Sequence, residues 1–242
     1  MTLSARGLAL GYGHHTVLRE LSVDIAPGQC WAVLGNNGSG KTTLLHTLAG
    51  IRAPLAGTVA LDQRSLAELN AGARARSIGL LLQDEPLEFW GSVLEYAGLG
   101  RYPHRGVRLT AALGDDGIAR EQLNLLELGA FAARPLASLS GGERQRARLA
   151  LVLTQQPVYY LLDEPLQHLD LRHQARVLTH FAGLAAQGGV AVVIVLHDPV
   201  LAWRYCDHAM LLHDHSAPQS GARREILTEA NLERLYGIRV TL

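Results

Sequence analysis

The amino-acid sequence predicts an α/β fold whose core is a mostly parallel sheet. Three segments of strand length are apolar throughout: Cys30–Leu34, Val158–Leu162 and Val190–Leu196. Helical patterns lie between such segments, and one of them spans Leu171–Ala186. Strands that alternate with helices and are buried on both faces are typical of parallel sheets covered by helices.

The first 86 residues predict two kinds of β structure and one helix. Alternating apolar residues at the N-terminus indicate an antiparallel β region, and the later strands belong to the parallel sheet. The expected strands are Leu8–Tyr12, Leu21–Ile25, Cys30–Leu34, Gly57–Leu61 and Ile78–Gln83. A glycine-rich loop at 35–43 follows the third strand, and the residues after it show the apolar spacing of a helix.

The middle of the chain, residues 87–152, changes to a mainly helical pattern rich in Ala, Leu, Glu and Arg. We interpret this block as an insertion into the sheet domain, so the sequence predicts a single domain over residues 1–242. Its predicted parts are a core, residues 1–86 and 157–242, and a helical subdomain, residues 87–156. The tail predicts a short helix at Leu227–Tyr236, with Thr228 as its N-cap.

Composition and charge disfavour several classes of protein. Apolar residues are 48% and charged residues 18% of the 242, which is typical of a globular chain. Lys+Arg and Asp+Glu are both 22, so the formal charge is zero and no net basic field favours nucleic acid. No apolar run approaches the ~20 residues that span a bilayer. With no secretory pattern and only Cys30 and Cys206, we expect a soluble intracellular protein.

A phosphate-binding loop is indicated by residues 35–42, which match G-x-x-x-x-G-K-[ST] between a predicted strand and a predicted helix. These flanks disfavour the alternative, a glycine-rich loop that merely turns the chain. Lys41, the only lysine, would reach the β- and γ-phosphates, and the Thr42 hydroxyl would ligate Mg²⁺. The residues predicted to bind nucleotide here are Gly35, Asn36, Asn37, Gly38, Ser39, Gly40, Lys41, Thr42 and Thr43.

Two carboxylates, Asp163 and Glu164, directly follow the predicted strand at 158–162. Ligands of parallel α/β sheets bind outside the carboxyl ends of the strands, so both acids are expected beside the phosphate loop. Asp163 can then hold Mg²⁺, and Glu164 can polarise an attacking water as general base. A strand end that is simply solvated is the alternative.

A turn at Leu139–Glu143 opens a predicted helix. Ser140 and Glu143 have the spacing of a capping box. Gly141 and Gly142 each cost about 1 kcal/mol of helix propensity relative to Ala, and a cap does not need them. A backbone that must approach a bulky anion closely does need them, and a helix N-terminus favours anions.

Together, the loop at 35–42, Leu-Ser-Gly-Gly-Glu at 139–143 and Leu-Leu-Asp-Glu-Pro at 161–165 resemble the nucleotide-binding subunits of ABC transporters. Their order and spacing match the family over essentially the whole chain. The resemblance implies a phosphate-loop ATPase core that uses ATP and Mg²⁺.

The resemblance also implies roles for four isolated residues. Tyr12 matches the aromatic residue that stacks on adenine, and Gln83 matches the glutamine that senses Mg²⁺ and the attacking water. His197 matches the histidine that contacts the γ-phosphate, and Asp170 lies in the loop that communicates between two sites. In that loop, Gln167 and His168 depart from the commonest residues. The implied catalytic residues are Lys41, Gln83, Glu164 and His197, and the implied Mg²⁺ ligands are Thr42, Gln83 and Asp163.

The implied assembly is a head-to-tail dimer of two copies. In it, Ser140, Gly141 and Gly142 of one copy close over the γ-phosphate held by the other. The other implied partners are separate permease subunits with many spans and, indirectly, a substrate-binding protein. Such a subunit is peripheral, on the cytoplasmic face of the inner membrane.

Gly100–His104 and the tail at 225–237 resemble the corresponding segments in importers of metal chelates. The cargoes of these importers are cobalamin, ferric siderophores and haem, and cobalamin is favoured. Phe89, Trp90 and Tyr96 are expected to form the groove for a permease helix, unless they pack inside the helical subdomain.

Other classes of protein are disfavoured. ABC ATPases of DNA repair carry long coiled coils and those of translation carry two cassettes, and the sequence has neither. A catalytically silent regulatory module would not need the complete set of hydrolytic residues, and an exporter half would bring its own spans. A structural metal site at His208, His213 and His215 is also disfavoured, because their spacing is not a tight ligand set.

Overall fold

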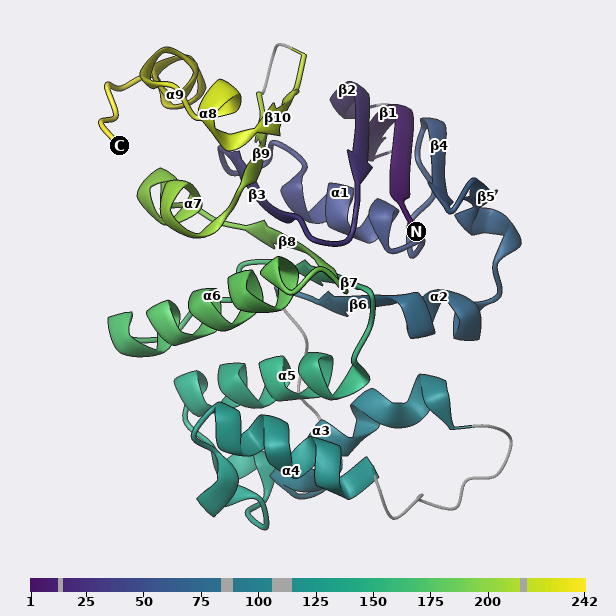
Figure 1. Ribbon diagram of the computed structural model, residues 1–242, viewed down its shortest axis with the longest axis vertical. Coiled ribbons are helices and arrows are strands. Elements are labelled where there is room, and N and C mark those ends of the chain that lie inside the picture. Colours follow the sequence, from purple (N-terminus) through teal and green to yellow (C-terminus); the bar gives the residue numbers. More distant parts are fainter. Residues whose placement is uncertain (13–14, 84–88, 106–114, 214–216) are drawn as a thin grey trace.

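The computed structural model describes residues 1–12, 15–83, 89–105, 115–213 and 217–242, without the side chains of Tyr12, His15 and Asp115 (Figure 1). Within these residues the strands form two sheets. The antiparallel sheet has the order β2-β1-β4-β5, with β1 Leu3–Tyr12, β2 His15–Ile25, β4 Ala56–Leu61 and β5 Arg64–Ser65. The predicted N-terminal antiparallel region is therefore confirmed.

The second sheet has the order β10-β9-β3-β8-β7-β6, and every neighbouring pair is parallel except β9–β10. Its strands are β3 Cys30–Gly35, β6 Ile78–Leu81, β7 Tyr159–Leu162, β8 Ala191–Val195, β9 His208–Leu212 and β10 Gln219–Ala222. This confirms the predicted mostly parallel sheet. The hairpin β9–β10 was not predicted, because its apolar run of Ala209–Leu212 is too short to show a period.

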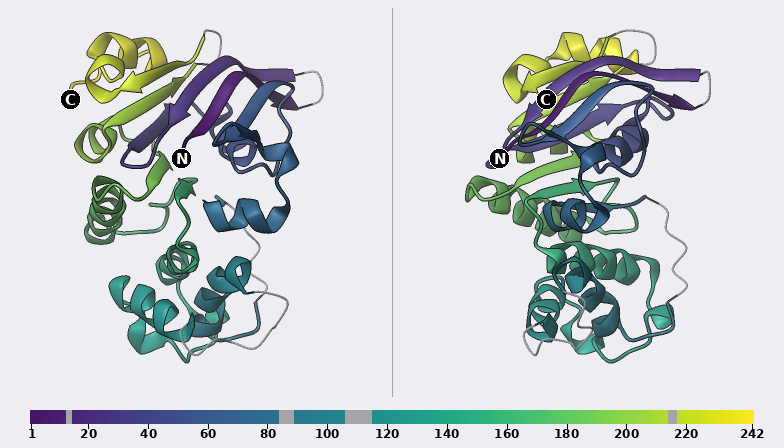
Figure 2. Two further views of the ribbon diagram at one scale, coloured as in Figure 1. Left: turned by 45° about the vertical axis from the view of Figure 1, so that its right-hand side comes forward. Right: turned by 90° about the vertical axis from the view of Figure 1, so that its right-hand side faces the viewer.

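Helices cover both faces of the second sheet (Figures 1 and 2). They are α1 Lys41–Leu48, α2 Ala71–Ser77, α3 Val93–Gly98, α4 Asp115–Leu125, α5 Gly141–Gln155, α6 Leu171–Ala186, α7 Pro199–Tyr205, α8 Arg223–Ile226 and α9 Glu229–Tyr236. Short 3₁₀ turns are η1 Leu66–Glu68, η2 Leu99–His104, η3 Gly129–Phe131 and η4 Leu136–Ser138. The predicted cap of the tail helix is confirmed, because the Thr228 side chain accepts from the Asn231 N–H. No described helix is long and apolar enough to cross a membrane.

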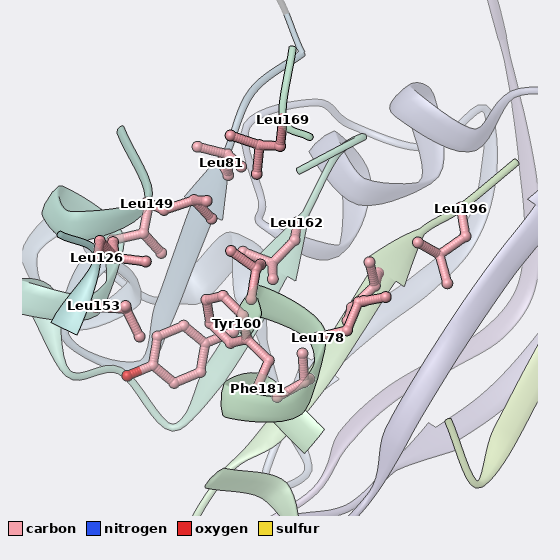
Figure 3. Close-up of a cluster of buried hydrophobic side chains, with 14 of the residues drawn as sticks. Leu81, Leu126, Leu149, Leu153, Tyr160, Leu162, Leu169, Leu178, Phe181 and Leu196 are labelled. Atoms are coloured by element: carbon pink, nitrogen blue, oxygen red, sulfur yellow. The ribbon is translucent and has the colours of Figure 1, made fainter. Parts of the chain in front are cut away.

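The central strand β3 shows why its sequence is apolar throughout. Cys30, Ala32 and Leu34 face the core shared with α5 and α6. Trp31 and Val33 face a second core, in which α1 lies between the two sheets. Figure 3 shows part of the first core, where side chains of β6, β7, α5 and α6 meet. Both faces of the strand are therefore buried, as the sequence predicted.

The helices of residues 93–155 pack on one another at one end of the molecule, the lower end in Figure 1. α5 joins them to the core, since it packs both on α3 and α4 and beside β6. Helix boundaries alone do not test the predicted division at residues 86 and 157, which stays a prediction.

Candidate functional site

A cavity of about 450 Å³ opens at the carboxyl ends of β3, β7 and β8, where ligands of such sheets bind. Its lining consists mainly of the side chains that the sequence assigned to phosphate binding and hydrolysis. The lining residues are Val17, Asn37, Gly38, Gly40, Lys41, Thr42, Thr43, Gln83, Glu164 and His197. Five segments that are separate in the sequence therefore meet at one cavity.

Glycine is required at several positions of the loop. A Cβ on Gly35 would lie 2.5 Å from the Ser39 Oγ and 2.7 Å from the Leu212 carbonyl oxygen. Gly38 and Gly40 have φ of 84° and 93°, in the left-handed region that favours glycine. Gly40 is also the N-cap of α1 and has no side chain to cover the start of the helix, and Gly40, Lys41, Thr42 and Thr43 all line the cavity.

The Lys41 ammonium is held inside this loop. Its Nζ donates to the carbonyl oxygens of Gly35 and Asn36, each at 2.8 Å, and the residue is only 6% exposed. The positive charge therefore lies at the N-terminus of α1, beside the cavity. This arrangement suits the phosphates of a nucleotide.

Asp163 is fully buried, and no described residue makes a well-formed hydrogen bond to either of its carboxylate oxygens. Burial raises the pKa of the Asp163 carboxyl, and the charge of Glu164 raises it further. The nearby Thr42 hydroxyl, His46 and Lys41 lower it in part. A buried carboxylate without a partner, beside a hydroxyl, fits the oxygen ligands that Mg²⁺ prefers.

Replacing this unpaired charge should stabilise the free protein. We expect Asp163→Asn to raise the apo Tm by about 2–4 °C, since removing an unsatisfied buried charge gains about 1 kcal/mol. Because the folded-state pKa of Asp163 is raised, the wild type becomes less stable as pH increases through this range. The difference in Tm between the variant and the wild type should therefore grow with pH. The variant should also lose the stabilisation that Mg²⁺ with ATP gives the wild type.

Thermal unfolding at several pH values, with and without Mg²⁺ and ATP, measures both effects. Asp116→Asn, at an exposed carboxylate on α4, is the control and should change neither. An Asp163→Asn variant with wild-type Tm and an intact Mg²⁺ response would contradict the assignment.

The adjacent Glu164 faces the cavity instead. It has φ of 47°, an uncommon backbone conformation for Glu, and its side chain is 11% exposed. Its Oε1 lies 2.9 Å from the His197 Nε2, and its Oε2 accepts from the Gln167 Nε2. The carboxylate is therefore ordered at the cavity wall, and the His197 side chain beside it is half-exposed.

Helix α5 contributes two buried polar side chains that the sequence analysis missed, Gln145 and Arg148. The Arg148 guanidinium donates to the carbonyl oxygens of Leu82 and Gln83 and to the Gln145 Oε1. The Gln145 Nε2 donates to the Pro165 carbonyl oxygen at 3.0 Å. They tie α5 to the strand ends that carry Gln83 and Glu164, but within an Arg-rich helix they give no sequence signal.

The turn before α5 confirms the capping box. The Ser140 N–H donates to the Glu143 Oε2 at 2.7 Å, and the Glu143 N–H donates to the Ser140 Oγ at 3.4 Å. A contact within the same chain explains the glycine at 142, since a Cβ there would lie 2.7 Å from the His168 carbonyl oxygen. Ser140 and Gly141 are exposed and do not line the cavity of their own chain.

The remaining predicted residues lie as follows. Tyr12 ends β1, and its side chain is outside the described residues. Asp170 caps α6 through the His173 N–H.

The three histidines considered for a metal site have other surroundings. His208 stacks on Trp31 and lies beside Asp207, and His213 forms a hydrogen bond with Gln219. His215 is outside the described residues. In the described part of the chain, no three His, Cys, Asp or Glu side chains are grouped so as to hold a metal.

The predicted aromatic groove needs a correction. Tyr96 is 5% exposed and packs edge-on against Phe89, with ring centroids 5.5 Å apart. It belongs to the core, because it lies on the face of α3 that packs on α5. Phe89 is half-buried, whereas Trp90 is 98% exposed. Of the three, Trp90 alone is fully available at the surface.

Comparison with known proteins gives matches over nearly the whole chain. A family model described as ABC transporter matches residues 18–167. The hemin import ATP-binding protein HmuV of Bordetella avium is 38% identical, with 98% of this chain and 93% of the relative covered. The ferric enterobactin transport ATP-binding protein FepC of Escherichia coli is 37% identical, with 98% and 88% covered.

Solved structures of ABC proteins are also similar to this chain over most of its length. A metal-chelate type ABC transporter in an inward-facing conformation has a TM-score of 0.84 at 32% identity, covering 98% of this chain and 90% of the other. A dimer of the ATP-binding cassette MJ0796, bound to ADP and Pi after hydrolysis, has a TM-score of 0.80 at 26% identity, covering 93% and 99%.

Proposed function

Because the chain belongs to the ABC transporter family as an ATP-binding subunit with ATPase activity, we propose that it powers a metal-chelate importer. Relatives that carry names of haem and ferric siderophore import support these two cargoes. Cobalamin, which the sequence analysis favoured, stays an alternative within the same class. The subunit lacks contact with cargo in this scheme, so the cargo is decided by its permease and binding protein.

The observation that carries the proposal is the meeting of loop 37–43, Gln83, Glu164 and His197 at one cavity. Lys41 and the N-terminus of α1 bind the phosphates of ATP there. Mg²⁺, when bound, neutralises charge on the β- and γ-phosphates, and Thr42, Gln83 and Asp163 are the residues that would hold it.

Glu164 accepts a proton as the water oxygen bonds to the γ-phosphorus, and the bond between that phosphorus and the bridging oxygen of ADP breaks. His197 lies next to Glu164 and donates toward the departing phosphate. Each of these groups is already placed at the cavity wall.

A second copy completes the site in this proposal. Ser140 and Gly141 are exposed and do not reach the cavity of their own chain. The dimer of the similar cassette MJ0796 supports the pairing of two copies. In the proposed head-to-tail arrangement, the turn at 140–142 and the loop at Asp170 act on the nucleotide of the other copy.

The permease contact is proposed at the surface around Trp90, which precedes α3 and is 98% exposed. Further exposed apolar side chains follow on η2, where Leu99 and Tyr102 are 45% and 69% exposed. Large aromatic side chains that are this exposed favour an interface, where they contribute much of the binding energy. Such a surface suits a cytoplasmic helix of a membrane partner.

We expect Trp90→Ser to weaken association with the permease about tenfold, because it removes the largest exposed aromatic group of this surface. ATP hydrolysis by the isolated subunit should not change. Pull-down of the tagged subunit with the co-expressed permease measures the effect. Ile51→Ser, at another exposed apolar side chain between α1 and β4, should leave the association intact. Equal losses in both variants would contradict the assigned surface.

Co-expression with the neighbouring reading frames tests the function itself. The purified complex should contain a permease with many spans, and its ATPase rate should rise with binding protein loaded with haem or a ferric siderophore. A rise with cobalamin alone would move the cargo to cobalamin. Purification without any membrane partner would overturn the importer.

A further inference from the structure

Gln167 contacts the carboxylate to which hydrolysis is assigned. The Gln167 Nε2 donates to the Glu164 Oε2 at 2.5 Å. The backbone N–H of Gln167 also donates to the Glu164 carbonyl oxygen, at 3.3 Å. The two residues are thus joined twice, by a main-chain turn and by their side chains. His197 lies at the other carboxylate oxygen, Oε1, at 2.9 Å.

The loop that carries Gln167 is also held by contacts that do not involve Glu164. Before it, the Pro165 carbonyl oxygen accepts from Gln145 on α5 at 3.0 Å. After it, the Leu169 N–H donates to the Leu166 carbonyl oxygen at 3.2 Å, and Asp170 caps α6. The backbone of Gln167 is therefore held by the fold. The side chains of Gln167 and Glu164 each have three rotatable bonds, and the hydrogen bond between them orders both.

The chemistry of the pair decides which of the two side chains donates the hydrogen bond. An ionised carboxylate only accepts hydrogen bonds, and a glutamine amide supplies the donor. A bond at Oε2 fixes the rotation of the carboxylate and leaves Oε1 toward His197 and the cavity. Loss of the amide frees this rotation, and a general base that is not held in geometry is less effective.

We propose that Gln167 is a positioning residue for ATP hydrolysis, which holds the Glu164 carboxylate with Oε1 toward the attacking water. Gln167 is unchanged in the reaction and does not contact the nucleotide. The inference rests on the proposed role of Glu164 as the base. It assigns a function to a position at which this sequence departs from the commonest residue of its family.

The first test is Gln167→Leu, which removes the amide and keeps a similar volume. The steady-state kcat should fall about tenfold to a hundredfold, while KM for ATP stays within twofold, because the residue acts in the chemical step. Gln167→Glu should lose at least as much, because it places a second carboxylate against Glu164. Two variants of different chemistry keep the test valid if one of them fails to fold.

Gln174→Leu is the matched control. Gln174 lies on α6 and lines the same small cavity of about 260 Å³ as Gln167 and Glu164. Its amide donates to the Leu169 carbonyl oxygen at 3.0 Å instead of to Glu164. We expect its kcat to match the wild type. A loss equal to that of Gln167→Leu would show that any change in this cavity slows the enzyme, and would overturn the proposal.

A double-mutant cycle separates positioning from a structural role. If Gln167 acts through the Glu164 carboxylate, Gln167→Leu should not lower further the single-turnover rate of Glu164→Gln. An unchanged tenfold loss in that background would overturn the proposal, as would a kcat of Gln167→Leu within twofold of the wild type. Near-normal turnover of Glu164→Gln alone would instead overturn the assignment of the base, so the two failures can be told apart.

Discussion

Glu164→Gln is expected to keep ATP binding and to lower turnover by about 10²–10⁴-fold, the usual contribution of a general base. The amide has the shape of the carboxylate, and its single oxygen can still accept from the Gln167 Nε2. The phosphate contacts proposed for Lys41 and α1 are not altered. What the variant lacks is a group that takes the proton of the attacking water.

Nucleotide binding by calorimetry and phosphate release under saturating ATP give the two quantities separately. Glu121→Gln is the control, since Glu121 is an exposed carboxylate on α4 outside the cavity. Its turnover should equal that of the wild type. A Glu164→Gln variant with near-normal turnover would refute the assignment, whereas one that no longer binds ATP would indicate a structural role.

The parts of the site that lie within one short segment could be predicted from the sequence. The loop at 35–43 and the acids Asp163 and Glu164 each follow an apolar strand, and the order of residues along the chain shows both the turn and its ligand groups. The resemblance to a family then placed Gln83 and His197, which alone look like ordinary strand-end residues. The structure brings all of them to one cavity.

The residues that support this site could not be predicted, because their contacts are made across the fold. Arg148 and Gln145 look like surface residues of a charged helix, yet both are buried and bond carbonyl oxygens near Gln83 and Glu164. Tyr96 fails in the opposite sense. Its position in the sequence suggested a surface groove, and only the packing of α3 on α5 shows that it is buried.

The loop from Glu164 to Asp170 contacts both the cavity and the turn at 140–142. Gln167 reaches back to the carboxylate at the cavity. The neighbouring His168, with φ of 61°, places its carbonyl oxygen where a side chain at Gly142 would clash. The glycine of the turn at 140–142 therefore allows this loop to pack on the start of α5. The loop that begins at Glu164 therefore contacts, through His168 and Gly142, the turn that is proposed to act on the second copy.

Ser140→Arg should abolish ATP hydrolysis while nucleotide binding by the single subunit remains. Ser140 is exposed and lies outside the cavity of its own chain, so a long cationic side chain there does not obstruct ATP bound by that chain. In a head-to-tail dimer, the same side chain would enter the space beside the γ-phosphate of the partner. We expect at least a hundredfold loss of turnover, because the proposed mechanism requires closure of the dimer.

The variant also removes a helix cap, which costs about 1 kcal/mol, so this effect must be measured separately. The chain offers a matched control in Ser92, which forms the same capping box with Glu95 at the start of α3. Ser92→Arg should lower Tm to a similar extent and leave hydrolysis unchanged. If Ser92→Arg abolished turnover as well, loss of a cap would suffice to explain both. If Ser140→Arg alone prevents hydrolysis, with ATP binding intact, the turn acts on a nucleotide that its own chain does not hold.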